Sequence, residues 1–109
     1  MDLMNINDAM ARLNNNKRLY TMLLKKFDAQ SMLDDLVAKI NSGDAAAAQA
    51  QAHTIKGLAA NLSLADLKEK TEAIESQLKN GDMAIDTAEI ELSVSQTIEA
   101  VNSWVAENS

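Results

Sequence analysis

Apolar residues recur at steps of three and four along most of this chain, a spacing that is typical of helices with one buried face. The N-terminal part holds two such stripes, made up of Leu19, Tyr20, Leu23, Leu24 and Phe27 and then of Leu33, Leu36, Val37 and Ile40. At about 100° per residue the two stripes point in different directions, so one straight helix cannot turn both toward one core. We therefore expect a break near residues 28–31, with Ser31 and Asp34 spaced as a capping box.

A helix over residues 44–62 is predicted by its boundaries and by its spacing. Gly43 favours the end of the preceding helix, and Asp44 favours the start of the next one. The apolar residues recur about every 3.5 positions and form the side that should face the other helices. They are Ala45, Ala48, Ala52, Ile55, Ala59 and Leu62.

Further capping patterns mark the helices that follow. Ser63 and Asp66 have the spacing of a capping box, which predicts the start of a helix that ends at residues 80–81. Asp86 and Glu89 have the same spacing and predict the start of a long last helix.

The N-terminal segment adds a short helix, which Asn5 or Asn7 can cap. It ends at residues 14–16, three asparagines whose side chains favour caps and turns, and Asn16 then caps the next helix. Because the connections are short, successive long helices should lie antiparallel. The sequence thus predicts an all-α fold over residues 1–109, a single domain formed by an up-and-down antiparallel four-helix bundle with a short extra N-terminal helix.

Composition supports this fold and excludes several functions. The chain has no proline, three glycines and only three aromatic residues, so its core must be aliphatic. Its net charge is −6 and it lacks a basic stripe, which argues against nucleic acid as a partner. The absence of cysteine excludes thiolate chemistry. No apolar run approaches the ~20 residues that cross a bilayer, and no signal-peptide pattern is present, so we expect a cytoplasmic protein without membrane insertion.

His53 is the only histidine, and the predicted helix turns it roughly 140° away from the bundle-facing side. A solvated helix face usually carries charged residues, but the neighbours of His53 on this face are mostly small. They are Ala46, Ala50, Gly57, Ala60 and Asn61. A glycine inside a helix costs up to about 1 kcal/mol relative to alanine. The flat face around the imidazole therefore indicates that another protein approaches the ring.

An exposed imidazole can act as a nucleophile that takes a group on a ring nitrogen and gives it up again. A phosphoryl group held there needs positive charge nearby, and Lys56 lies about one helical turn further on. Other chemistries lack their partners, since one histidine does not make a zinc site, no orienting carboxylate is expected beside the ring, and no glycine-rich loop would bind ATP. We expect no metal, no cofactor and no autonomous enzyme. A lone surface histidine without function remains the alternative at this point.

The segment AHTIKGLAANLSLADL, residues 52–67, resembles the phosphorylation motif of histidine-containing phosphotransfer (HPt) domains. The resemblance extends to INDAMARLNNNKRLYTMLLKKF (6–27), to the spacing in SGDAAAAQAQAHTIKG (42–57) and to ESQLKNGD (75–82), and so covers nearly the whole chain. Two departures are a serine at position 63, where many members have glycine, and a segment after Phe27 that is shorter than is common.

What the resemblance implies is a phosphorelay intermediate of two-component signal transduction. His53 would accept a phosphoryl group on its outer ring nitrogen from a receiver-domain aspartate and pass it to another receiver domain. Lys56 would stabilise the phosphoryl charge, Gly57 would admit the receiver, and Asn61 would match a polar position one turn beyond. Magnesium would belong to the receiver.

The resemblance also implies a docking face on the first helix and the start of the second, beside His53. Candidate contact residues are Ile6, Met10, Leu13 and Leu23. The implied partners are response-regulator receiver domains and a hybrid histidine kinase, and we expect a monomer. Two alternatives stay open: the phosphoryl-accepting domain of a chemotaxis-type or hybrid kinase, and a receiver-binding module without phosphotransfer.

Overall fold

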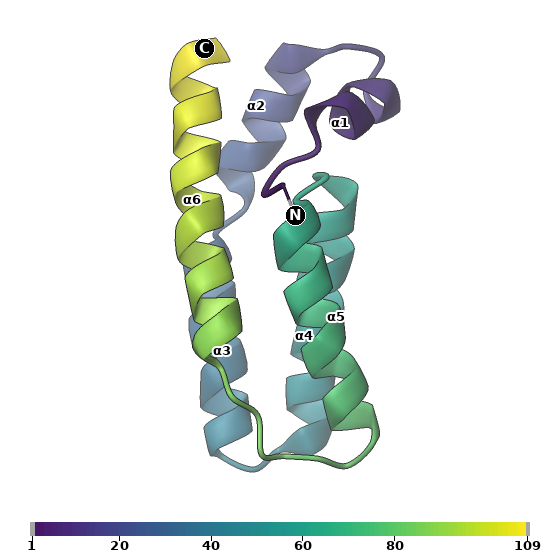
Figure 1. Ribbon diagram of the computed structural model, residues 1–109, viewed down its shortest axis with the longest axis vertical. Coiled ribbons are helices and arrows are strands. Elements are labelled where there is room, and N and C mark those ends of the chain that lie inside the picture. The colour runs from purple at the N-terminus through teal and green to yellow at the C-terminus, as the bar shows by residue number, and fades with distance from the viewer. Residues whose placement is uncertain (1, 109) are drawn as a thin grey trace.

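The computed structural model describes residues 2–108, and within this range it contains six α-helices and no strand (Figure 1). The helices are α1 (Ile6–Arg12), α2 (Lys17–Lys26), α3 (Ala29–Asn41), α4 (Ala45–Asn61), α5 (Ala65–Lys79) and α6 (Ala88–Asn108). The molecule is elongated and measures 41 × 22 × 21 Å.

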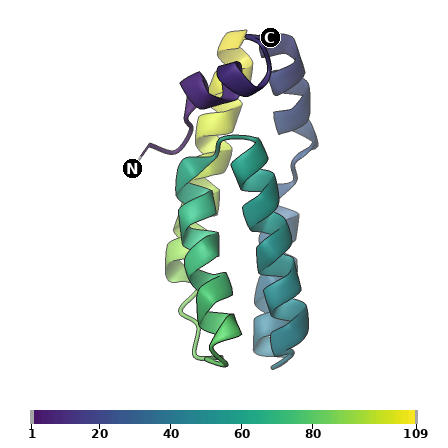
Figure 2. The same ribbon diagram turned by 90° about the vertical axis from the view of Figure 1, so that its right-hand side faces the viewer.

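The bundle has four long members, one of which consists of α2 and α3 placed end to end. α4 packs against α3 and α5, α5 packs against α6, and α6 packs against both α2 and α3, which closes the ring. α4 and α5 lie side by side as an antiparallel hairpin, and α6 runs along most of the length of the molecule (Figures 1 and 2). The predicted all-α bundle with a short N-terminal helix is confirmed.

The break in the first long member lies at Phe27 and Asp28, where the sequence predicts it. Phe27 has an extended backbone (φ −84°, ψ 102°), and Asp28 Oδ1 caps α3 by accepting from the N–H of Ser31 at 3.1 Å. The predicted capping box is wrong, because Ser31 lies inside the first turn of α3. Asp34 instead accepts a hydrogen bond from the Gln30 side chain at 3.0 Å.

The turn between α4 and α5 holds the N-terminal segment in place. Ser63 has a positive φ of 57°, and α5 begins after Leu64 without a side-chain cap, so the predicted box of Ser63 and Asp66 is not formed. The Ser63 hydroxyl instead donates to Asp8 Oδ2 at 2.7 Å, and its carbonyl accepts from the N–H of Asn5 at 2.8 Å. These two bonds fix α1 across the end of the α4–α5 hairpin (Figure 1).

Side-chain caps start three other helices at the predicted residues. The side chains of Asn5, Asn16 and Asp44 each accept from the backbone N–H three residues further on, at 3.0 Å. At the last helix the prediction is off by one residue, because a cap at Asp86 would start the helix at residue 87. α6 begins at Ala88, whose N–H donates to Asp86 Oδ1 at 3.0 Å, so the capping box with Glu89 is not used.

The packing of α4 determines which of its residues reach the surface. The predicted bundle-facing residues from Ala48 to Leu62 are buried, and Ala45 is half-buried. The end of α4 is tied to α2, because the buried Tyr20 hydroxyl donates to the carbonyl of Leu62 at 2.7 Å. Tyr20 also packs edge-on against Trp104 of α6. With one side of α4 fixed in the core, the opposite side, which carries His53, faces outward.

Candidate functional site

His53 lies in the middle of α4, and 72% of its side chain is exposed. The outward orientation predicted from the helical wheel is therefore what the structure shows. Ile55 and Ala52, its close neighbours along the helix, are buried in the core. The ring is thus carried by a helix whose other side is firmly packed.

A carboxylate from α5 contacts the inner nitrogen of the ring. His53 Nδ1 lies 3.1 Å from Oε2 of Glu75, a side chain that is only 5% exposed. Glu75 is 22 residues away in sequence and reaches the ring because α4 and α5 pack side by side. The expectation that no orienting carboxylate lies beside the imidazole is therefore wrong.

Two lysines contact the other oxygen of the same carboxylate. Lys56 Nζ donates to Glu75 Oε1 at 3.0 Å, and Lys79 Nζ lies 3.5 Å from that atom. Burial by itself raises the pKa of Glu75, but the hydrogen bonds from Lys56 and His53, together with their charges, outweigh burial and hold the pKa below its ordinary value. Glu75 is therefore ionised at neutral pH.

The ionised carboxylate decides which ring nitrogen carries the proton. A carboxylate only accepts hydrogen bonds, so Nδ1 of His53 must be the donor to Glu75. In the neutral ring the free lone pair then belongs to Nε2. The two nitrogens point in opposite directions, so Nε2 is turned away from Glu75, on a ring that is mostly exposed. The arrangement presents an oriented nucleophile at the surface.

The small residues around His53 keep this surface open. Ala46, Ala50, Gly57 and Asn61 are exposed, and Ala60 is half-buried. A Cβ atom added at Gly57 would meet nothing within 4 Å, so packing inside the protein does not require glycine there. The structure thus places these five candidates on one accessible face with His53.

The candidates on α1 are placed differently, because α1 turns its apolar side toward the bundle. Met10 is only 8% exposed and belongs to the core, so its predicted role as a partner contact conflicts with its burial. Ile6 and Leu13 are half-buried and pack against the core. Leu23 of α2 is also half-buried and lines a surface groove.

This groove, of about 520 Å³, lies between α4 and the break that separates α2 from α3. Its lining residues are Leu23, Lys26, Phe27, Asp28, Ser31, Met32, Leu58, Asn61 and Leu62. Leu58 of α4 is 37% exposed, and Gly57 lies between it and His53 around the helix. Sequence reasoning missed Leu58, although a leucine outside the bundle-facing positions of this helix was a visible sign of an exposed apolar contact.

Within residues 2–108, no three His, Cys, Asp or Glu side chains are grouped so as to hold a metal ion. In the same part of the chain, no helix has both the length and the apolar character needed to cross a bilayer.

The fold and the site together define a helical bundle that presents one oriented, exposed histidine at its surface. The sequence model of the Hpt domain family matches residues 20–104, and the chain belongs to this family. Hpt domains carry phosphoryl groups in phosphorelays of two-component systems and interact with receiver domains and kinases. Searches among curated proteins and among solved structures found no match.

Proposed function

We propose that this protein is a cytoplasmic phosphorelay intermediate. It accepts a phosphoryl group on Nε2 of His53 from a receiver-domain aspartate and passes the group to the aspartate of another receiver domain. The observation that carries the proposal is the contact between Nδ1 and the buried, ionised Glu75, which leaves Nε2 as the free nucleophile. Membership of the Hpt domain family supports the same role.

The transfer needs no proton to leave the histidine. The Nε2 lone pair attacks the phosphorus of the aspartyl phosphate, the bond from phosphorus to the carboxyl oxygen breaks, and the aspartate leaves as a carboxylate. Nδ1 keeps its proton, so the phosphorylated ring is cationic, and Glu75 supplies the opposite charge at 3.1 Å. In the second transfer a receiver carboxylate attacks the phosphorus and Nε2 is the leaving group. Magnesium, where the reaction needs it, belongs to the receiver.

Lys56 supplies positive charge on the phosphoryl side. The phosphoryl group adds a charge of about −2, and Lys56 lies one helical turn from His53 on the same helix. Its side chain is 26% exposed, and its ammonium donates to Glu75 before phosphorylation. A turn of this flexible side chain brings the ammonium from Glu75 to the phosphoryl oxygens.

The receiver docks over Gly57, with the apolar groove on one flank and His53 on the other. The small side chains let its aspartate come close to Nε2, and Leu58 with the other apolar groove residues supplies buried contact area. The groove continues the surface that carries His53, so a single partner covers both.

Labelling tests the proposed transfer. A panel of receiver domains carrying ³²P on their aspartates, with magnesium present, is incubated with the protein. We expect an acid-labile, alkali-stable label on the wild-type protein and none on His53→Gln, which should keep its helical circular dichroism. Magnesium and ATP alone should give no label.

Other results would contradict the proposal. A label that persists in His53→Gln would exclude His53 as the acceptor. Labelling by a kinase catalytic domain with ATP, but by no receiver, would indicate a kinase accessory domain instead. Receiver binding without any label would indicate a docking module.

A further inference from the structure

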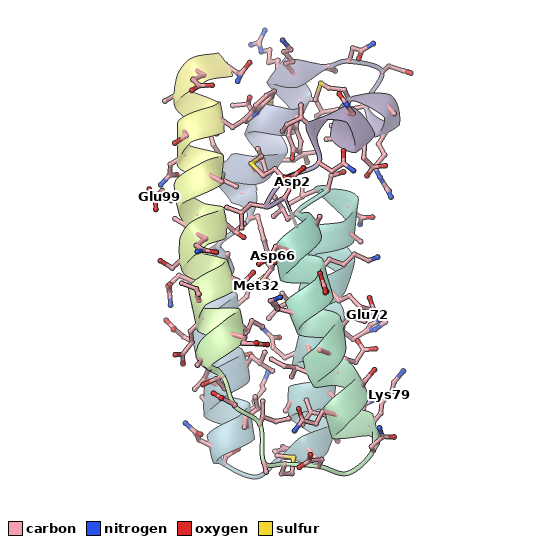
Figure 3. All side chains as sticks on the ribbon, viewed as in Figure 1. Asp2, Met32, Asp66, Glu72, Lys79 and Glu99 are labelled. Atoms are coloured by element: carbon pink, nitrogen blue, oxygen red, sulfur yellow. The ribbon has the colours of Figure 1, made fainter. Side chains whose placement is uncertain are left out.

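Two lysines from different helices converge on one oxygen of Glu75. Lys56 of α4 donates to Oε1 at 3.0 Å, and Lys79 of α5 lies 3.5 Å from it. Lys79 follows Glu75 by four residues, the order of acid and base that suits an ion pair within a helix. Its side chain is 59% exposed, and Figure 3 places it on the outer side of α5, away from α6. Lys79 can therefore change its conformation without disturbing the core.

If His53 is phosphorylated, as the function proposed above requires, Glu75 needs a different cation to stay ionised. The phosphoryl group on Nε2 lies on the opposite side of the ring from Glu75, so Lys56 has to turn away from Oε1 to reach it. His53 Nδ1 would then be the one hydrogen-bond donor left to Glu75, and the phosphoryl group near this carboxylate would carry a charge of about −2. Loss of a cation and gain of a nearby anion both favour protonation of a carboxylate. A protonated Glu75 would no longer stabilise the cationic ring.

We propose that Lys79 is a reserve counter-ion for Glu75. When Lys56 turns to the phosphoryl group, Lys79 Nζ closes on Oε1, keeps the carboxylate ionised and so preserves its hydrogen bond to Nδ1. Lys79 is thus a positioning residue that acts through Glu75, and Lys56 is the one that meets the phosphoryl group. The site uses two lysines because its buried carboxylate and the incoming phosphoryl group both need a cation at the same time.

A matched control lies on the same helix. Lys70 pairs with Asp66 at the same four-residue spacing, with Nζ 3.7 Å from Oδ1, whereas Glu75 pairs with His53 and with Lys56 and Lys79. A plain surface ion pair would make Lys70 and Lys79 equivalent. The proposed role makes them different.

The test uses phosphoramidate, which transfers its phosphoryl group to a histidine nitrogen and releases ammonia, so that no receiver is needed. We expect Lys79→Gln to lower the initial rate of His53 phosphorylation roughly two- to fivefold, the size of one partly exposed ion pair. Lys79→Arg should restore most of the rate, and Lys70→Gln should match the wild type. In a Glu75→Gln background, Lys79→Gln should have no further effect.

Two outcomes would overturn the role of Lys79: a wild-type rate in Lys79→Gln, or an equal loss of rate in the Glu75→Gln background. Failure of the proposed function is a different result. In that case the wild type takes no label from phosphoramidate or from a receiver, or His53→Gln is labelled as well.

Discussion

Glu75 joins side chains that lie far apart in the sequence into one site. It is buried, it contacts both His53 and Lys56, and its ionised state follows from these partners and not from solvent. Its charge therefore contributes to stability as well as to the orientation of the ring. The two contributions can be separated by pH and by an isosteric substitution.

Glu75→Gln should lower the free energy of unfolding by about 1–2 kcal/mol at neutral pH, because it weakens hydrogen bonds between charged groups. The folded state lowers the pKa of Glu75, so its contribution is complete above the ordinary glutamate value of 4.5 and is lost as the pH falls through the lower folded-state value. Urea unfolding of both proteins, followed by Trp104 fluorescence from neutral pH to about pH 3, should show a difference that narrows with acidity. A difference that stays constant or widens would contradict this account.

The half of the site on α4 could be predicted from the sequence, and the half on α5 could not. A helical wheel places His53, Lys56 and Gly57 relative to the buried side of their own helix. It says nothing about which residue of another helix comes into contact, so Glu75 was missed. The visible sign was a carboxylate four residues after Thr71 and three before Leu78, both of which are buried, in the predicted helix over about 63–80. A charge at the edge of an apolar stripe requires a partner.

At the scale of single helices, two substitutions of Gly57 test its effect on stability and its effect on phosphoryl transfer separately. A Cβ atom fits there without a contact, so Gly57→Ala should raise the free energy of unfolding by about 0.5–1 kcal/mol. Gly57→Leu should also fold, since its side chain points to solvent, but it should lower phosphoryl transfer from a receiver at least tenfold by blocking the approach.

Thermal unfolding measures the change in stability, and receiver-dependent labelling measures phosphoryl transfer. Phosphoramidate, which is small, should still label Gly57→Leu at close to the wild-type rate. Equal transfer from the receiver to Gly57→Leu and to the wild type would show that the partner does not pass over this position.

Tyr20 ties α2 to the end of α4. Burial, with a smaller contribution from the charge of Asp8, raises its pKa to about 12. The neutral phenol is thus favoured in the folded state, and its contribution to stability is complete below the ordinary value of 10.0 and is lost as the pH rises toward about 12. Because Tyr20 is the only tyrosine, titration of the phenolate absorbance measures this pKa directly. A phenolate transition near the ordinary value would contradict the burial of Tyr20.

Tyr20→Phe should lower the free energy of unfolding by about 1–2 kcal/mol at neutral pH, since the Leu62 carbonyl loses its donor.

Helix boundaries could be predicted where a side chain caps its own helix, as Asn5, Asn16 and Asp44 do. The box predicted at Ser63 and Asp66 was wrong because both side chains bond to other helices. The Ser63 hydroxyl donates to Asp8 of α1, and Asp66 accepts from the hydroxyl of Ser93 in α6 at 2.7 Å. Local spacing cannot distinguish a cap from a contact between helices, because the same polar atoms serve both.

At the scale of the whole molecule, the order of the helices in the ring produces the docking surface. α6 packs against both α2 and α3 and holds the two pieces in one rod, while the break between them opens the groove toward α4. The short connections predict the antiparallel order of the helices, but the groove depends on how α4 packs beside the junction of α2 and α3.

The neighbouring segment 9–27 has five basic residues and no acidic one in a chain of net charge −6. An acidic partner surface therefore suits this side of the molecule, and its association should weaken with salt.

Two exposed leucines test where the receiver binds. Leu58 lines the groove beside Gly57, and Leu92, which is 59% exposed, lies on α6 and does not line the groove. Leu58→Asp should weaken receiver-dependent phosphorylation of His53 at least tenfold, because a charge enters the apolar contact, whereas Leu92→Asp should leave the rate unchanged. Labelling by phosphoramidate should be the same for both variants and the wild type, which shows that the acceptor itself is intact. If Leu92→Asp reduced the transfer and Leu58→Asp did not, the receiver would have to approach His53 from the α5–α6 side, and the groove would have no part in docking.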